Sequence, residues 1–356
     1  MQKESSAYND EIHIDTLRYA RHFEIAHTDN YKRITIFDPW HEGQTLGRYY
    51  LVHDSLTETP DDGLRIRIPL QRLVIGSASY IGYLEALGLL DKIAACPDTV
   101  QIYSPTVISQ VREGKTLPFG DPYAVNTETI LRMRPDLIMM IGYAGTDQST
   151  ERLRSLRQPV ITNVEWTEPC ILGRAEWIKM FGAFYDLESE ADSIFLGIEA
   201  NYNRLKVLAQ TTNDKPSILP GAPFRGTLYM PGGQGFMTKM FRDANGSYLH
   251  SDNSERESIG LDLETVVRNF VNADIWIGAD ATSMHQLLST ESRYALLKPV
   301  KTGQVYNNSR HATPTGGNLY WEATPVHPDW LLEDLIRVLH PDLLTSGEYH
   351  FLQQLK

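Results

Sequence analysis

Two stretches of the sequence decide the fold, because they repeat one unit in the two halves of the chain. The first runs Asn126-Thr-Glu128-Thr-Ile-Leu-Arg132 and leads into the apolar run Leu137 to Ile141. The second runs Asp262-Leu-Glu264-Thr-Val-Val-Arg268 and leads into Ile275 to Ile277. Each contains a helix N-cap residue, a glutamate two positions later, a short helix and then a strand. An internal repeat of this kind predicts two lobes of related architecture.

The glutamates of the repeat, Glu128 and Glu264, have two interpretations. Helix capping explains either acid alone, because Asn126 and Asp262 can accept first-turn N–H bonds and an acid is stabilised at the positive end of a helix dipole. Capping does not explain why the same acid recurs in matched units. Helix N-termini in parallel α/β sheets lie where ligands and partners approach. We therefore expect Glu128 and Glu264 to be exposed, one on each lobe.

The sequence around the repeat alternates between strands and helices, which predicts parallel sheets covered by helices. The stretch Gly173 to Gln210 contains no proline and carries apolar residues at helical spacing. It favours one continuous connecting helix of about 55 Å, and Gly182, Gly197 and the Tyr185-Asp186 region are the places where it could break. The N-terminal region is rich in aromatic and β-branched residues and predicts a β-rich extension packed on the first lobe. The predicted extension, first lobe, connecting helix and second lobe cover residues 1–64, 65–172, 173–210 and 211–356.

Composition limits the classes of function. A chain of 356 residues exceeds what one hydrophobic core usually supports. A net charge of -12 argues against nucleic acid as the partner, since phosphate binding requires a cationic surface. The acidity either serves docking on a basic partner or only maintains solubility. Met1 to Asp10 are polar and lack the apolar region of a signal peptide, so we expect either a cytoplasmic protein or one whose export signal was removed. Cys96 and Cys170 could form one disulfide in an exported protein, and the sequence leaves this open.

The motifs of common catalytic and metal sites are missing from the sequence. No HExxH, P-loop or GxSxG motif is present, and the 11 histidines are dispersed. Pro231-Gly232-Gly233 is only a weak candidate for a phosphate-binding turn. We expect no catalytic residue, no resident metal and no cofactor. A metal-handling or cofactor-handling enzyme on a similar scaffold is the alternative, with Glu165 and His311 as its best acid–base pair.

The repeat residues carry a resemblance to a known family. Glu128-Thr-Ile-Leu-Arg-Met-Arg-Pro-Asp-Leu137, the proline-free connector and the ending Pro328-Asp-Trp-Leu-Leu-Glu-Asp-Leu-Ile336 resemble the class III periplasmic binding proteins of ABC importers, which carry ferric siderophores, haem and vitamin B12. The resemblance covers about residues 65–356. It implies two Rossmann-like lobes joined by a single long helix, with a ligand cleft between them.

The resemblance also implies partners and a location. Glu128 and Glu264 would pair with arginines of the membrane permease, which makes the permease the protein partner. We expect a monomer that binds a metal chelate and no nucleic acid. The location implied is the periplasm or the outer leaflet as a lipoprotein, with the export signal absent from this sequence.

Loops that follow the strands are expected to line the cleft. Candidate ligand contacts are aromatic, cationic or imidazole side chains in these loops: Tyr80, Tyr143, Trp166, Arg225, Arg310, His311, Tyr320 and Trp321. Aromatic faces suit a large flat or macrocyclic ligand, although packing is the alternative role for each. Arg225 and Arg310 could meet carboxylate or catecholate oxygens, or form surface salt bridges. The predicted ligand is a ferric siderophore or haem, and a corrinoid is the alternative. Trp40 and His41 could reach the cleft rim, but the sequence does not place them.

Overall fold

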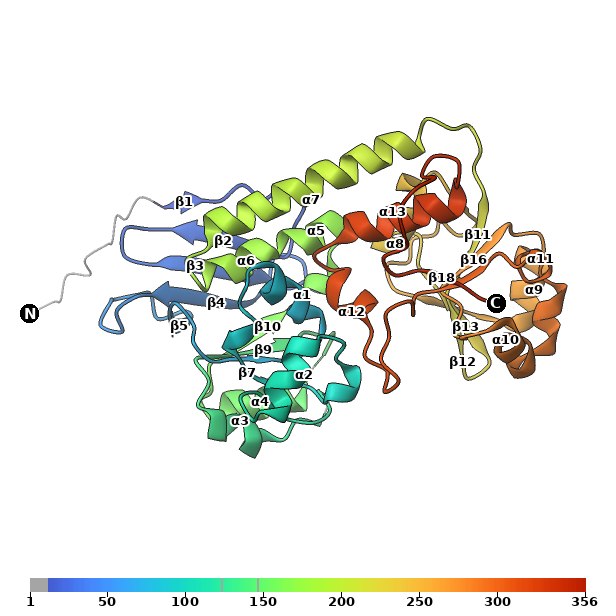
Figure 1. The fold of residues 1–356 in the computed structure, drawn as a ribbon. Helices are drawn as coiled ribbons and strands as arrows, with labels where there is room; N and C mark the ends of the chain where they lie inside the picture. The colour runs from blue at the N-terminus through green and yellow to red at the C-terminus, as the bar shows by residue number, and fades with distance from the viewer. Residues whose placement is uncertain (1–11, 123, 146) are drawn as a thin grey trace, which may run out of the picture.

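The computed structural model describes residues 12–122, 124–145 and 147–356, which form two α/β lobes and an N-terminal sheet. Figure 1 shows the lobes side by side, with helix α7 (Glu188–Ala209) running along one edge from the first lobe to the second. The predicted fold class of two lobes with parallel sheets is confirmed.

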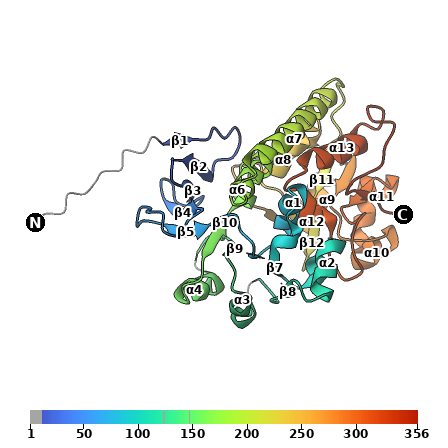
Figure 2. The same ribbon diagram turned by 60° about the vertical axis from the view of Figure 1, so that its left-hand side comes forward.

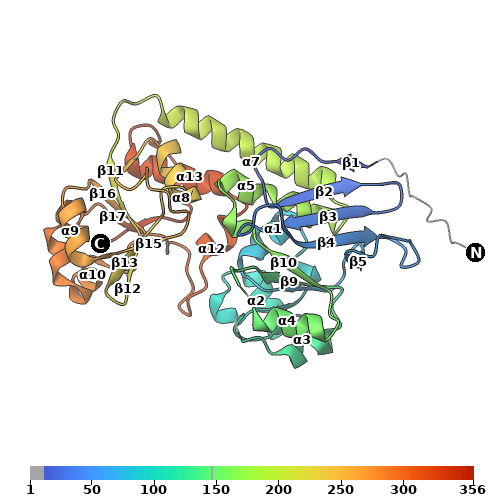
Figure 3. The same cartoon turned by 180° about the vertical axis from the view of Figure 1, so that it is seen from behind.

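The N-terminal sheet has the strand order β1-β2-β3-β4-β5. Its strands are β1 (His13–Ile14), β2 (Phe23–His27), β3 (Lys32–Phe37), β4 (Thr45–Val52) and β5 (Leu64–Arg67). They pair antiparallel except for β4 with β5. The sequence indicated a β-rich extension, and the structure makes it a five-stranded sheet. In Figures 2 and 3 this sheet lies on the side of the first lobe away from the second lobe.

The first lobe is built on a parallel sheet with the strand order β10-β9-β6-β7-β8. Its strands are β6 (Leu73–Ile75), β7 (Ile93–Cys96), β8 (Leu117–Pro118), β9 (Leu137–Ile141) and β10 (Val160–Asn163). Its helices are α1 (Ser79–Ala86), α2 (Pro105–Arg112), α3 (Thr127–Met133) and α4 (Gln148–Ser155). The strands are almost entirely buried, as expected when helices cover both faces of a parallel sheet.

The second lobe contains two sheets. The larger has the order β14-β11-β16-β17-β18. It contains β11 (Ser217–Pro220), β14 (Ser247–Tyr248), β16 (Ile275–Ile277), β17 (Val305–Asn307) and β18 (Gln353–Gln354). The smaller, β12-β13-β15, is antiparallel and contains β12 (Ala222–Phe224), β13 (Thr227–Met230) and β15 (Ile259–Asp262). Strand β13 follows β12 by a tight hairpin turn, so this part of the lobe departs from the predicted alternation of strands and helices in parallel sheets.

Six further helices complete the second lobe. They are α8 (Phe236–Asp243), α9 (Leu263–Phe270), α10 (Met284–Thr290), α11 (Lys298–Thr302), α12 (Leu319–Ala323) and α13 (Pro328–Leu339). Helix α12 leaves its own lobe and packs against α1 of the first lobe. This contact is close, because a Cβ placed at Gly82 in α1 would lie 2.2 Å from the carbonyl oxygen of Glu322. The chain therefore joins the lobes a second time, near its C-terminal end.

The prediction of one unbroken helix from Gly173 to Gln210 is wrong. The segment forms three helices, α5 (Ile171–Glu176), α6 (Ile178–Ala183) and α7, and α7 is the one that runs from the first lobe to the second. The chain turns after α6, where Asp186 adopts a left-handed φ of 57° that ends helical geometry. Gly182 allows α6 to pack closely on α7, since a Cβ there would lie 2.7 Å from the Cβ of Ala191.

Candidate functional site

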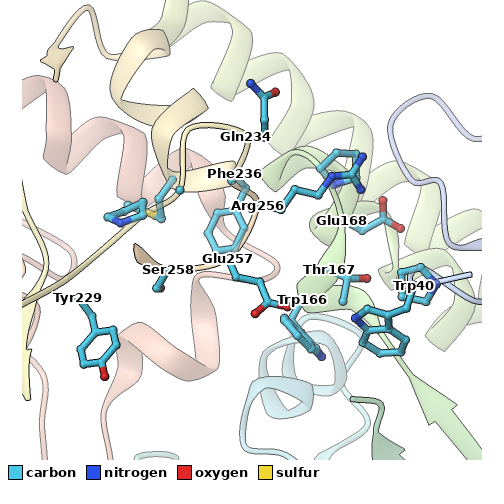
Figure 4. Close-up of a pocket in the computed structure, with 16 residues that line it drawn as sticks. Trp40, Trp166, Thr167, Glu168, Tyr229, Gln234, Phe236, Arg256, Glu257 and Ser258 are labelled. Atoms are coloured by element: carbon cyan, nitrogen blue, oxygen red, sulfur yellow. The ribbon is translucent and has the colours of Figure 1, made fainter. Parts of the chain in front are cut away.

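A cavity of about 500 Å³ lies between the two lobes. The first lobe contributes Trp166, Thr167, Glu168 and Pro169, and the N-terminal sheet adds Pro39 and Trp40. The second lobe contributes Tyr229, Pro231, Gly232, Gln234, Gly235, Phe236, Met237, Arg256, Glu257 and Ser258. Figure 4 shows Trp40 and Trp166 on one side of this space and Tyr229 and Ser258 on the other. Its volume falls within the range of about 300–1,000 Å³ that is usual for small-molecule sites.

Trp166 forms the centre of the first-lobe wall. It lies in a 3₁₀ turn, Glu165–Thr167, directly after the parallel strand β10. Its indole Nε1 donates to the carbonyl oxygen of Gly142 at 2.9 Å. The ring of Tyr143 lies 6.1 Å from the Trp166 ring, measured between centroids. The predicted residue Trp166 thus lines the cavity with a fixed orientation, and Tyr143 packs beside it.

A buried ion pair lies behind this wall, where the lobes meet. The Glu165 carboxylate accepts a hydrogen bond from Arg174 Nε at 2.6 Å. The Arg174 guanidinium lies 5.0 Å from the centre of the Phe236 ring in the second lobe. A buried carboxylate that is paired with an arginine has a structural role and does not act as a free acid or base. His311 lies instead beside Tyr103, with ring centroids 6.3 Å apart, so the structure does not assemble the acid–base pair considered for an enzyme.

Glu168 lines the cavity, but its carboxylate is already bound. It accepts hydrogen bonds from the backbone nitrogens of Arg21 and His22 and from the indole Nε1 of Trp177, at 2.8 to 3.1 Å. Burial raises the pKa of Glu168 to about 7, against the lowering effect of these donors. With its lone pairs used in this way, Glu168 shapes the cavity and holds the N-terminal segment.

The second-lobe wall depends on the antiparallel sheet. Pairing of β13 with β15 brings the preceding loop, residues 256–258, beside Tyr229. Arg256 is exposed and lines this wall of the cavity. Sequence reasoning missed Arg256, Glu257 and Tyr229, because they reach the cavity through strand pairing that no local motif signals.

Gly232 and Gly233 have a packing role. A Cβ at Gly232 would lie 2.3 Å from the carbonyl oxygen of Glu257, and one at Gly233 would lie 2.4 Å from that of Asn253. The glycines therefore allow two loops of the second lobe to pass closely. This contact explains the glycine pair without a phosphate-binding turn.

A second cavity of about 570 Å³ continues from the first into the second lobe. Both cavities are lined by Tyr229, Pro231, Met237 and Ser258. The second also contacts the loops after β16 and β17, and it includes the predicted residues Tyr320 and Trp321. The Trp321 side chain is large and 61% exposed. The two cavities together give an elongated aromatic site across the lobe boundary.

The remaining predicted ligand contacts lie elsewhere. Tyr80 is wrong as a cleft residue, because α1 turns it into the core at 1% exposure, 6.0 Å from the Phe181 ring. Arg225 lies at the exposed tip of the β12–β13 hairpin and lines neither cavity. Arg310 pairs with Glu348 at 2.6 Å, which is the salt-bridge alternative considered for it.

The repeated units have the expected local structure. Asn126 caps α3 by accepting from Thr129 N at 3.1 Å, and Asp262 caps α9 by accepting from Thr265 N at 2.8 Å. Glu128 and Glu264 are both exposed in the first turns of these helices. Arg293 lies 3.5 Å from the Glu264 carboxylate. Each lobe therefore presents one of the matched acids to solvent.

The described part of the chain contains no cluster of metal-binding side chains, no membrane-spanning helix and no disulfide. Among residues 12–122, 124–145 and 147–356, no group of three or more His, Cys, Asp or Glu side chains could hold a metal ion. No helix in the same ranges is long and apolar enough to cross a membrane. Cys96 and Cys170 are both free thiols, so the structure shows no disulfide between them.

Comparison with known proteins agrees with this architecture. The sequence profile of a family described as periplasmic binding protein matches residues 73–309. An uncharacterized lipoprotein of Methanocaldococcus jannaschii is 27% identical over 80% of this chain and 69% of its own length. A second uncharacterized lipoprotein of that organism is 25% identical over 94% of this chain and 85% of its own length.

Solved structures of low sequence identity share the fold. A periplasmic heme binding protein from Pseudomonas aeruginosa superposes with a TM-score of 0.62 at 17% identity, covering 81% of this chain and 98% of that one. A periplasmic vitamin B12 binding protein from Vibrio cholerae gives a TM-score of 0.57 at 16% identity, covering 76% of this chain and 97% of that one. The N-terminal sheet lies outside the range that matches the family profile.

Proposed function

The chain belongs to the periplasmic binding protein family, and on that premise we propose that it binds an iron chelate between its lobes and delivers it to the permease of an ABC importer. Proteins of this family bind ligands and do not catalyse reactions. The observation that carries the proposal is the inter-lobe cavity, whose aromatic lining comes from both lobes.

The lining favours a large, partly planar anionic ligand. Trp166, Tyr229 and Phe236 offer ring faces that bury apolar area with little loss of side-chain entropy. Arg256 lies at the same cavity with its side chain exposed, and can meet a carboxylate or catecholate oxygen. A ferric siderophore or haem combines both features. A corrinoid is the second candidate, since its macrocycle would use the same ring faces but not the arginine.

Delivery requires a surface for the permease. We assign this surface to Glu128 and Glu264, because they are exposed and occupy matched helix starts on separate lobes. Helices α3 and α9 both lie below α7 in the view of Figure 1. Basic groups on a permease would be attracted to acids in these positions. The working form is a monomer in the periplasm or anchored as a lipoprotein, in keeping with the lipoprotein relatives.

A titration tests the ligand class. Haem, a ferric triscatecholate, a ferric hydroxamate and cyanocobalamin would be added separately while visible absorbance and tryptophan fluorescence are recorded. We expect one of these chelates to shift its absorbance, quench fluorescence and bind with one-to-one stoichiometry. Failure of all four at micromolar concentration would reject the ligand class.

A further inference from the structure

Trp40 lies on the cavity although it belongs to the N-terminal sheet. It is in the loop that joins β3 to β4, outside residues 73–309 that match the family profile. Its ring centroid lies 6.2 Å from that of Trp166. Tyr143 packs on Trp166 as well, so Trp166 has two aromatic neighbours, of which Trp40 lines the cavity. Figure 4 shows Trp40 beside Trp166 and Thr167 at this end of the site.

The loop that carries Trp40 is held in one conformation. Asp38 Oδ1 accepts hydrogen bonds from the backbone nitrogens of Trp40 at 2.8 Å and His41 at 3.1 Å. The other oxygen of Asp38 lies 3.0 Å from His41 Nδ1. An aspartate that binds backbone groups two and three residues ahead stabilises a tight turn. The turn therefore fixes the backbone that carries Trp40, and the indole packs beside Trp166.

The sheet behind the loop is fastened to the first lobe by buried carboxylates. Glu176 accepts from the backbone nitrogens of Arg18, Tyr19 and Ala20 at 2.8 to 2.9 Å. Glu168 accepts hydrogen bonds from the backbone nitrogens of the next two residues, Arg21 and His22. The Phe23 ring then lies 4.8 Å from the buried ring of Trp177. These contacts make the sheet a fixed part of the first lobe rather than a separate tethered domain.

Core packing alone does not explain Trp40. The sheet already fills its interface with Ile34, Ile36 and Leu51, each at most 1% exposed. Trp40 packs against that core but keeps surface open to the cavity. Packing would be satisfied by an aliphatic side chain, whereas an indole on a cavity wall adds a flat face for a ligand.

We propose that the N-terminal sheet is a third wall of the binding site and that Trp40 contacts the ligand and helps determine its specificity. This inference rests on the proposed function, because it takes the inter-lobe cavity as the ligand site. The ligand that Trp40 recognises is the flat or macrocyclic part of a chelate. Trp40 would not increase the affinity for chelates that lack such a face.

The experiment compares four proteins: wild type, Trp40→Ala, Trp40→Leu and Glu42→Ala. Trp40→Leu retains apolar packing without an aromatic face, and Glu42 is an exposed residue of the same loop that lines neither cavity. The probes are haem, a ferric triscatecholate, cyanocobalamin and the aromatic dye anilinonaphthalene sulfonate. Circular dichroism and thermal unfolding check that each variant is folded.

We expect Trp40→Ala to weaken binding of the best probe about tenfold, Trp40→Leu to weaken it at least about threefold, and Glu42→Ala to leave it unchanged. Wild-type affinity in folded Trp40→Leu would overturn the inference. If no chelate binds wild type but the dye binds in a Trp40-dependent way, the ligand class of the proposed function fails while the third wall stands. Binding of no probe at all would reject both.

Discussion

Glu322, in the second-lobe helix α12, accepts a hydrogen bond from the backbone nitrogen of Ser104 in the first lobe at 3.1 Å. The same carboxylate accepts from Tyr103 N at 2.5 Å. The side chain is 2% exposed, so a charged group is buried at the second junction between the lobes. Protonation of this group changes the energy of the junction.

The first prediction concerns pH and stability. Burial raises the pKa of Glu322 to about 7, whereas an unfolded glutamate titrates near about 4.3. Between these values the folded chain holds a proton that the unfolded chain has lost, so the free energy of unfolding falls as pH rises from about 4 to about 7. Glu322→Gln, which stays neutral, should remove about 2 to 3 kcal/mol of this fall.

Thermal unfolding across this pH range measures the effect, and Glu190→Gln on the exposed start of α7 is the control. Glu168 also makes the free energy of unfolding fall between about pH 4 and pH 7, because burial raises the pKa of Glu168 to about 7 as well. The free energy of unfolding should therefore fall less steeply with pH in Glu322→Gln than in wild type, and it should still depend on pH in both proteins. Identical slopes would show that Glu322 does not titrate in this way.

The second prediction tests the contact between α1 and α12. Gly82→Ala should destabilise the protein by about 1–3 kcal/mol, because its Cβ would lie 2.2 Å from the Glu322 carbonyl oxygen. Gly197→Ala is the matched control, since a Cβ in that exposed part of α7 meets nothing within 4 Å. It should stabilise the helix by about 0.5–1 kcal/mol. Denaturant unfolding measures both, and a neutral effect of Gly82→Ala would contradict the close packing.

The third prediction addresses delivery to the permease. The double variant Glu128→Ala, Glu264→Ala should retain chelate affinity within about twofold but lose permease-dependent uptake, since the two acids lie outside both cavities. Uptake in vesicles containing the permease measures this loss. Glu190→Ala removes one exposed acid from α7 and should transport normally. Normal uptake by the double variant would eliminate these residues as the docking surface.

The fourth prediction distinguishes two arginines. Arg256→Ala should weaken binding of anionic chelates about three- to tenfold and have less effect on the neutral cyanocobalamin. Arg225→Ala should be neutral, because Arg225 lies at a hairpin tip outside both cavities. Calorimetric titration at two salt concentrations measures both variants. Equal losses for Arg225 and Arg256 would mean that the arginines act only through general charge.

The sequence predicted those features that depend on local chemistry. The caps at Asn126 and Asp262 and the strands after them follow from patterns within a few residues. The break near Asp186 was one of three candidate positions, but the sequence did not select it, because a non-glycine residue with left-handed φ carries no composition signal. Tyr80 was misplaced because a tyrosine after a strand can face the cleft or the core, and only packing on Phe181 decides which.

The cavity was predicted only in part, for a related reason. Trp166 closely follows strand β10, and Tyr320 and Trp321 end the long segment after β17, so the rule that segments after strands line the cleft found all three. Arg256 and Tyr229 come together through antiparallel pairing. Trp40 was a candidate for the cleft rim, but only the sheet held by remote carboxylates places it on the cavity. Contacts of such long sequence separation leave no local pattern.

Locating the metal of a bound chelate tests the central claim most directly. Crystals of the protein grown with the chelate that binds best would be measured at the absorption edge of its metal, so that anomalous scattering marks the metal position. Our account predicts a single strong peak between the lobes, in the space bordered by Trp166 and Tyr229. A peak on the outer surface of either lobe would contradict it.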